Sequence, residues 1–245
     1  MHSIVFFDTE TDRNGKKLYD IGGCLDDGRQ FHDASLERFA SFLKGAEFVC
    51  GHNILQHDVK FVRSALATAS IPLQNAIDTL PWSPLLFPQK PYHALVKDDK
   101  LQTDAINNPL NDALKARDLF HDEVAAFSRL EPEMKSIFYG LLHDKGVFSA
   151  FFRYLNFRPA KEDITTFIFQ KFHSLICEKA EVARLVEENP IELAYALAII
   201  NCQHRFSLTP PWVLKNYPKI ERVTALLRSK PCLEGCSYCR QHLDI

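Results

Sequence analysis

The chain has 245 residues, of which 46% are hydrophobic and 24% charged, a composition that is typical of a folded globular protein and excludes disorder as the main state. Its longest apolar run, 193–200, is far shorter than the roughly 20 residues of a membrane-spanning helix, and its first residues predict no secretory signal. The net charge of −2 provides no strong basic field, so a nucleic acid would have to be held by a local patch or through metal ions.

The first half of the chain alternates between two kinds of apolar pattern. Short apolar runs rich in β-branched and aromatic residues predict strands at 3–8, 18–24, 30–32, 46–50 and 76–80. Apolar residues at helical spacing predict helices at 35–43, 58–67, 92–101 and 110–127. Four prolines between Pro81 and Pro91 argue against regular structure there. This order of elements fits a mixed sheet that is covered by helices.

From about residue 128 the strand signals disappear. Helical spacing predicts helices at 137–142, 147–155, 164–177, 191–202 and 213–227, the last interrupted at Pro218. We therefore expect an α/β domain at 1–127, a helical domain at 128–230 and a cysteine-rich tail at 231–245.

Two carboxylates stand at the end of the first predicted strand. Asp8 and Glu10 are two residues apart, so they project from the same face of the strand. Adjacent carboxylates repel each other, and both remain ionised when a cation lies between them. The pattern predicts a Mg²⁺ or Mn²⁺ site, although a solvated acidic strand end would look the same in sequence.

Two further carboxylates begin predicted helices. Asp58 follows the segment Gly51-His52-Asn53, and Asp112 opens the long helix. Taken singly, each also fits an acidic residue that stabilises a helix N-terminus. Asp104 and Asp118 compete with Asp112, but Asp104 has no helix-opening pattern behind it and Asp118 lies inside a helix on the expected water-facing side. We therefore retain Asp112.

These segments resemble the three sequence motifs of one enzyme superfamily. Asp8-Thr9-Glu10-Thr11, Gly51-His52-Asn53 leading to Asp58, and Asp112-Ala113 are similar to the motifs of the DEDD superfamily, the DnaQ-like 3′–5′ exonucleases. Ile77-Asp78-Thr79-Leu80 resembles a strand that this family carries between its second and third motifs. The resemblance covers about residues 3–125. It implies an α/β fold with an RNase H-like mixed five-stranded sheet and flanking helices, followed here by an all-α region.

The resemblance also implies the chemistry of the site. The metal ligands and catalytic residues that it implies are Asp8, Glu10, Asp58 and Asp112. They would hold two Mg²⁺ or Mn²⁺ ions roughly 3.5–4 Å apart, one to activate water and one to stabilise the leaving oxygen of a phosphodiester. Thr11, His52 and Asn53 would contact the substrate.

The third motif departs from the family pattern. The family has a His five residues before the last Asp, or a Tyr four before it, and here these positions hold Asn107 and Asn108. Neither amide can act as a general base, a role typically worth about 10²–10⁴ in rate. His57 and His93 are candidate replacements. The alternative is a catalytically weak or inactive module that keeps the fold and binds nucleic acid.

A cluster of soft ligands lies near the C-terminus. Cys232, Cys236, Cys239 and His242 fall within eleven residues and could close a tetrahedral Zn²⁺ site. Cys202 or His204 could supply the fourth ligand instead. With Cys202 as the fourth ligand, an iron–sulfur cluster is also chemically possible. The remaining cysteines are interpreted as reduced, buried thiols: Cys24, Cys50, Cys177 and Cys202.

The layout of the whole chain is similar to the exonuclease-like N-terminal region that precedes RecQ-family DNA helicases in some bacteria. The residues that carry this resemblance are Pro210-Pro211-Trp212-Val213-Leu214 and Gly235-Cys236-Ser237-Tyr238-Cys239-Arg240. It implies the front portion of a longer cytoplasmic protein, with no membrane partner. DNA with a 3′ end would be the substrate, and a helicase would lie in the same chain or complex.

Overall fold

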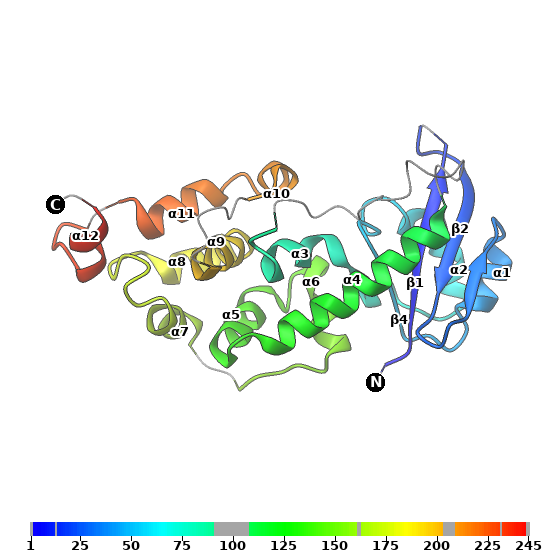
Figure 1. Ribbon diagram of the computed structural model, residues 1–245, viewed down its shortest axis with the longest axis horizontal. Helices are drawn as coiled ribbons and strands as arrows, with labels where there is room; N and C mark the ends of the chain where they lie inside the picture. Colours follow the sequence, from blue (N-terminus) through cyan, green and yellow to red (C-terminus); the bar gives the residue numbers. More distant parts are fainter. Residues whose placement is uncertain are drawn as a thin grey trace. The chain divides into compact units, whose positions relative to one another are not determined.

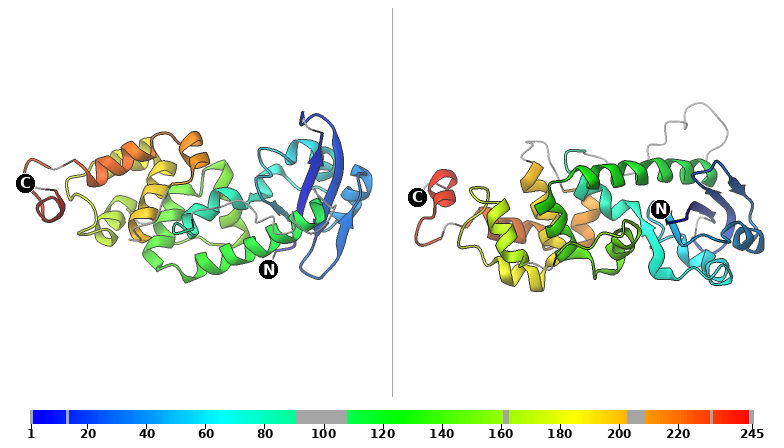
Figure 2. Two further views of the ribbon diagram at one scale, coloured as in Figure 1. Left: turned by 45° about the horizontal axis from the view of Figure 1, so that its top comes forward. Right: turned by 90° about the horizontal axis from the view of Figure 1, so that it is seen from below.

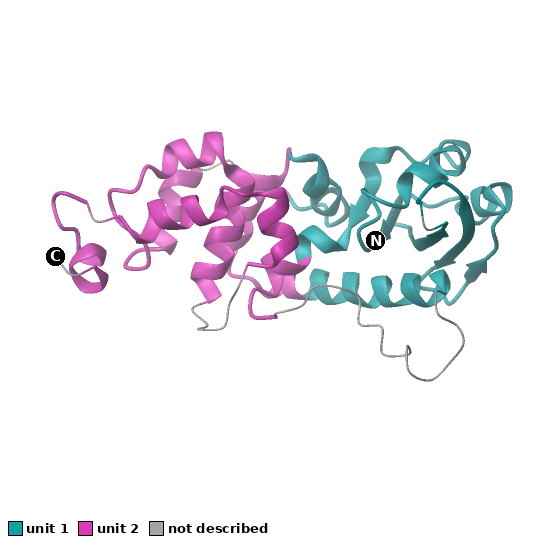
Figure 3. Ribbon diagram, turned by 90° about the horizontal axis from the view of Figure 1, so that it is seen from above, with its two compact units in different colours: residues 1–82, 94–125, 145–157 teal, residues 83–93, 126–144, 158–245 magenta. Residues whose placement is uncertain are grey.

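The computed structural model describes residues 2–12, 14–90, 108–160, 163–202, 209–230 and 232–243. The predicted helix at 92–101 and the predicted residues His93, Asp104, Asn107 and His204 lie outside these ranges. The chain forms two compact units (Figure 3). The first comprises Met1–Trp82, Ala94–Ala125 and Lys145–Phe157, and the second comprises Ser83–His93, Ala126–Asp144 and Arg158–Ile245.

The first unit is built on a mixed five-stranded sheet (Figure 1). Its strands are β1 (Ile4–Thr11), β2 (Leu18–Cys24), β3 (Gln30–His32), β4 (Phe48–Gly51) and β5 (Ala76–Asp78). They lie in the order β3-β2-β1-β4-β5, with β1–β2 and β2–β3 antiparallel and β1–β4 and β4–β5 parallel. This confirms the predicted fold class and is compatible with an RNase H-like fold.

Alternate residues of β1 face different helices of this unit. Phe7 points to α1 (Leu36–Phe42), where its ring centroid lies 5.7 Å from that of Phe39. Phe6 points to α4 (Pro109–Arg129), where its centroid lies 5.6 Å from that of Phe120. The core on the Phe7 side also includes residues of α2 (Val59–Thr68). Helices α1 and α2 therefore cover one face of the sheet, and α4 covers the other (Figure 2).

The proline-rich segment after β5 corrects a prediction. Residues 81–91 were expected to lack regular structure, but α3 (Thr79–Leu86) is a helix with Pro84 inside it. Pro81 lies in the first turn, where a backbone N–H has no intrahelical partner to lose. Trp82 is fully buried and stacks on Phe151 of α6 (Gly146–Tyr154), with ring centroids 4.2 Å apart. Tertiary burial of this large side chain outweighs the low helix propensity of proline.

The second unit is helical, as predicted. Helix α9 (Pro190–Cys202) is buried along most of its length and packs against α5 (Pro132–Leu142), α8 (Val182–Glu188) and α11 (Ile220–Arg228). This unit also contains α7 (Ile164–Lys171), α10 (Pro211–Asn216) and α12 (Ser237–His242). The gap between α10 and α11 confirms the break predicted at Pro218.

One long helix was wrongly predicted in this unit. The pattern over 164–177 suggested a single helix, but α7 ends at Lys171. Ser174 then adopts a φ of 66°, a left-handed conformation that an α-helix cannot continue through. The segment after α7 is therefore a turn, and Cys177 lies at its end.

Helix α6 belongs to the first compact unit. The predicted domains 1–127, 128–230 and 231–245 stay predictions. Within the described part of the chain, none of the helices has the length and apolar character needed to cross a membrane.

Candidate metal centre

Three predicted carboxylates meet at one end of β1. Asp8 and Glu10 lie on the same strand face as Phe6, which is the face that α4 covers. Asp112 lies in the first turn of α4. One carboxylate oxygen from each of these three residues lies within 4.8 Å of the other two. Such a group of carboxylate oxygens is the ligand type that Mg²⁺ and Mn²⁺ prefer.

The start of α4 is fixed by local sequence. Asn108 caps the helix, because its Oδ1 accepts a hydrogen bond of 3.0 Å from the Leu110 amide, and Pro109 occupies the first helical position. Gly22 of β2 pairs with Asp8 in the sheet, and a Cβ added to it would lie 2.0 Å from the Leu110 nitrogen. The absence of a side chain at Gly22 therefore lets the first turn of α4 lie directly on the sheet beside Asp8.

Asp58 is held in a different way. It is the N-cap residue of α2, yet its side chain makes no capping hydrogen bond. Its Oδ1 instead accepts a hydrogen bond of 3.0 Å from the Thr9 amide and a second from the Thr9 hydroxyl. Burial raises the pKa of Asp58 to about 6, and the two hydrogen bonds from Thr9 oppose this rise. The carboxylate is thus oriented towards β1 and not used to stabilise its own helix.

A cavity of about 360 Å³ connects these groups. Asp58 lines it together with the three clustered carboxylates, although Asp58 is not part of the group within 4.8 Å. The lining also contains the residues predicted to contact substrate, Thr11, His52 and Asn53. Lys60 and His57 complete its polar wall. All the predicted catalytic carboxylates therefore border one cavity in the first unit.

The loop between β4 and α2 is anchored by Asp78 at the end of β5. The Asp78 carboxylate is buried and accepts hydrogen bonds from the amides of Asn53 (2.7 Å), Leu55 (3.1 Å) and Leu80 (3.0 Å). Asn53 has a φ of 63°, in the left-handed region that Asn tolerates better than most residues. Burial raises the pKa of Asp78 to about 6, while its three amide partners oppose the rise. Asp78 thereby holds the loop that leads into Asp58.

The remaining predicted side chains are placed as follows. The His52 Nδ1 atom lies 2.8 Å from the Thr79 hydroxyl oxygen, and His57 is exposed at the cavity edge. The competing Asp118 is exposed on α4, where its carboxylate lies 2.9 Å from the Arg117 guanidinium, and it does not line the cavity.

Several supporting residues of the site were not predicted. Thr9 and Asp78 lie inside quoted motifs but had no role assigned to them, and nothing in the sequence pointed to Lys60. Gly22 did carry a signal, because a glycine inside a strand often marks a close backbone approach.

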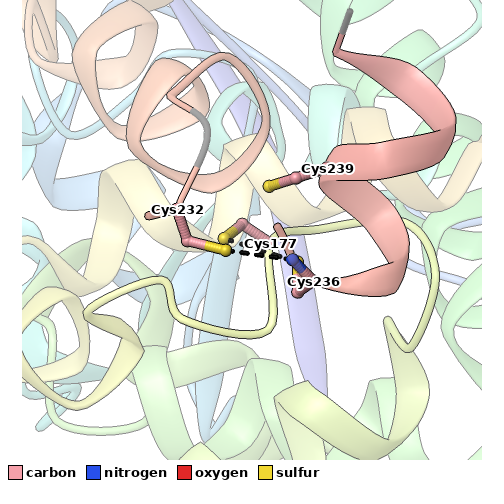
Figure 4. Close-up of side chains that lie close together, drawn as sticks. All are labelled: Cys177, Cys232, Cys236 and Cys239. Carbon is pink, nitrogen blue, oxygen red and sulfur yellow. Dashed lines mark hydrogen bonds between the residues drawn. The ribbon is translucent and has the colours of Figure 1, made fainter. Parts of the chain in front are cut away.

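The cysteine cluster differs from its prediction in one ligand. The Sγ atoms of Cys177, Cys232, Cys236 and Cys239 lie within 4.8 Å of one another (Figure 4). His242 is not in this group. It is exposed, and its ring centroid lies 4.8 Å from that of Tyr238.

The predicted alternative Cys202 is also outside the cluster, because its thiol contacts Gln89 at 3.4 Å. Cys177 is a free, buried thiol, as the sequence predicts, but no sequence pattern indicated that it lies beside the tail. The chain fold brings it to the tail from 55 residues away in sequence.

Comparison with protein-family models, with curated proteins and with solved structures finds no match for this chain. The assignment of chemistry therefore rests on the residues and their geometry.

Proposed function

We propose that this chain is a metal-dependent 3′–5′ exonuclease-type domain of the DEDD superfamily that hydrolyses phosphodiester bonds of nucleic acid, with DNA as the first substrate to test. The observation that carries the proposal is the convergence of the Asp8, Glu10 and Asp112 carboxylates. Asp58 borders the same cavity as this group. The proposal places the reaction in the cytoplasm, on DNA with a free 3′ end and in association with a helicase.

Each side chain has a distinct part in this proposal. A bound pair of Mg²⁺ or Mn²⁺ ions would supply an activated water and charge stabilisation for the leaving oxygen. Asp8, Glu10 and Asp112, on the α4 side of β1, and Asp58, at the start of α2, are the residues that would hold these ions. Lys60 adds a positive charge to the cavity wall, where it can attract a phosphate group.

His57 is our candidate for the proton acceptor. Asn108 is engaged as the cap of α4, and the Nδ1 of His52 faces the Thr79 hydroxyl. His57 is exposed at the cavity, and imidazole is the side chain that most readily exchanges protons near neutral pH. We expect His57→Gln to lower the turnover rate by about 10²–10⁴ without weakening Mn²⁺ binding. An unchanged rate in this variant would remove His57 from the mechanism.

The second candidate function is a module that binds nucleic acid without cutting it. The observation that favours it is the capping role of Asn108, which occupies one of the two positions where the family carries a residue that orients water. This module would bind Mn²⁺ through the same carboxylates, would bind DNA through the bound ions, and would show no turnover.

A nuclease time course separates these proposals. The substrates are 5′-labelled single-stranded DNA and 3′-recessed DNA, in Mg²⁺, in Mn²⁺ and in EDTA. We expect a ladder that shortens from the 3′ end, is lost in EDTA and is lost in Asp8→Asn and Asp112→Asn. Asp118→Asn, on the same helix as Asp112 but outside the cavity, is the matched control and should keep full activity.

Calorimetric titration with Mn²⁺ and with DNA completes the test. Folded wild-type protein that binds both ligands but leaves the DNA intact would establish the binding module. Folded protein that binds neither ligand would exclude both functions.

A further inference from the structure

Four cysteines from two distant segments of the second unit meet at one point (Figure 4). Cys177 lies in the turn after α7, whereas Cys232 precedes α12, Cys236 is its N-cap residue and Cys239 lies within it. The Sγ atoms of Cys177 and Cys236 are 3.8 Å apart, and all four thiols are free.

The spacing of the sulfurs matches one particular kind of site. With Zn–S distances of about 2.3 Å, the sulfurs at the corners of a tetrahedron are roughly 3.8 Å apart. A disulfide would instead require sulfurs about 2.05 Å apart. In a four-iron cluster each cysteine binds a different iron, so the sulfurs stand further apart than the ligands of a single ion. All pairs of Sγ atoms in this cluster lie within 4.8 Å, a spacing that favours the binding of a single ion.

We propose that Cys177, Cys232, Cys236 and Cys239 together bind a single Zn²⁺ ion, which fastens the C-terminal segment 232–243 to the turn at Cys177. Four thiolates complete the tetrahedral shell of the ion and leave no open position for a substrate. The site is therefore structural.

The backbone around the cluster is arranged to support thiolates. The Lys179 amide points to the Cys177 Sγ at 3.4 Å, and the Cys236 amide points to the Cys232 Sγ at 3.2 Å. Hydrogen bonds from N–H groups stabilise sulfur in its charged form, which is the form that binds metal. Two of the four sulfurs, those of Cys177 and Cys232, are therefore positioned to accept a backbone hydrogen bond while they bind a metal ion.

Among the described residues, the C-terminal segment is also held by a small apolar cluster, in which buried Tyr238 packs with Ala180 and Leu243, and by a few polar contacts. Helix α12 is only six residues long, well below the length at which an isolated helix is stable in water. The Tyr238 hydroxyl donates a hydrogen bond of 3.0 Å to the Arg228 carbonyl, and the ion pair between Lys179 and Glu234 is exposed. An exposed ion pair contributes little and the apolar cluster is small, so the shared metal would add a large share of the binding energy of this segment.

On the other side of the cluster, the Cys177 amide donates a hydrogen bond of 2.8 Å to the Leu227 carbonyl at the end of α11. This bond fixes the Cys177 turn to the helical body of the unit. The ion would therefore connect the short helix α12 to the Cys177 turn, which is already anchored to the end of α11.

Metal analysis of the whole chain tests the proposal. The protein is purified under reducing conditions without chelator, and zinc and iron are measured by mass spectrometry with inductively coupled plasma. We expect about one zinc per chain in the wild type, in Cys202→Ser and in His242→Ala, and loss of this zinc in Cys177→Ser. Cys202→Ser is the matched control, because Cys202 lies in the same unit but outside the cluster.

A second measurement uses only the wild-type protein, so its outcome does not depend on whether a substituted protein folds. Removal of zinc by a chelator should speed tryptic cleavage after Arg240, an exposed residue of α12, at least tenfold, and added Zn²⁺ should restore protection. Iron with visible absorption, a Cys177–Cys236 disulfide, or metal-free protein from zinc-replete cells would each overturn the proposal. So would loss of zinc from His242→Ala with retention in Cys177→Ser. Loss of nuclease activity is not a readout here, so the two proposals fail independently.

Discussion

At the scale of single residues, Thr9 links the two sides of the candidate metal centre. Asp8 and Glu10 face α4, whereas the Thr9 amide and hydroxyl both donate to Asp58 at the start of α2. We expect Thr9→Val to destabilise the protein by about 1–3 kcal/mol, because a buried carboxylate loses a donor. The loss should be larger at pH 8 than at pH 5, since the missing hydrogen bond favours the ionised form of Asp58.

Urea unfolding at the two pH values measures this effect, and Thr11→Val is its matched control. Thr11 lies on the same strand, is half-buried and donates only a long hydrogen bond of 3.3 Å to the Asp12 carbonyl. Its substitution should change the free energy of unfolding by less than about 0.5 kcal/mol. Equal effects at Thr9 and Thr11 would mean that the Thr9–Asp58 contact contributes nothing.

The Asp78 carboxyl predicts a pH dependence of stability. Its pKa is raised from 3.8 to about 6 by burial. Between these values the unfolded chain has released the proton and the folded chain still holds it, so the free energy of unfolding falls as pH rises. The raised pKa of Asp78 contributes about 3 kcal/mol to the free energy of unfolding. This contribution is fully present below pH 4 and is lost above pH 6.

Urea unfolding from pH 4 to pH 7 tests this prediction by comparing wild type with Asp78→Asn. The amide has no proton to release in this range, so the wild-type decline that Asp78 causes should disappear from the variant. The variant should also be less stable at pH 4, because one amide oxygen cannot accept three hydrogen bonds as well as a carboxyl group does. Asp118→Asn, at an exposed carboxyl, should keep the wild-type slope, and an unchanged slope in Asp78→Asn would contradict the assignment.

At the scale of elements, the contact between β2 and α4 sets the position of Asp112. A Cβ at Gly22 would lie 2.0 Å from the Leu110 nitrogen and 2.1 Å from the Pro109 carbonyl carbon, so backbone must move to admit it. We expect Gly22→Ala to cost about 1–3 kcal/mol of stability through overpacking. It should also weaken Mn²⁺ binding at least tenfold, because Asp112 moves away from Asp8.

Gly146→Ala is the control for this substitution. Gly146 begins α6, and an added Cβ there meets no atom within 4 Å, so the variant should be neutral or slightly stabilised. The measurements are urea unfolding and Mn²⁺ titration. Wild-type Mn²⁺ affinity in Gly22→Ala would show that the first turn of α4 does not position the third carboxylate.

The sheet could be predicted because its strands are short apolar runs with clear turns between them, and Asp8 and Glu10 follow from the period-two rule. The contacts of Asp58 and Asp112 could not be predicted, since each residue also fits a helix N-terminus. Only the structure shows that the Asp58 side chain bonds Thr9 instead of capping α2. Helix α3 was missed because burial of Trp82 outweighs the local effect of proline.

Cys177 shows a further limit of sequence analysis at this scale. Its spacing from Cys232 reflects the packing of α7, α8 and α9, and no local pattern encodes that packing. The three clustered cysteines were recognisable as a ligand set because their spacing lies within one short segment. A ligand contributed by a distant turn leaves no such trace in the sequence.

At the scale of the whole molecule, the two compact units carry ligand sets of opposite chemical character. The first unit groups carboxylate oxygens, which suit hard ions such as Mg²⁺ and Mn²⁺. The second unit groups thiol sulfurs, which suit Zn²⁺. Because each set prefers a different class of ion, the two sites should fill independently when both metals are present.

Hydrogen exchange measured by mass spectrometry tests this independence. Mn²⁺ should slow exchange at the end of β1, in the 53–58 loop and in the first turn of α4, because ligand binding suppresses local opening there. Removal of Zn²⁺ should speed exchange at 177–180 and 232–243. It should leave exchange unchanged at the end of β1, in the 53–58 loop and in the first turn of α4. Asp8→Asn should lose the Mn²⁺ response and keep the Zn²⁺ response. Protection of 232–243 by Mn²⁺ in zinc-free protein would show instead that one class of ion serves both ligand sets.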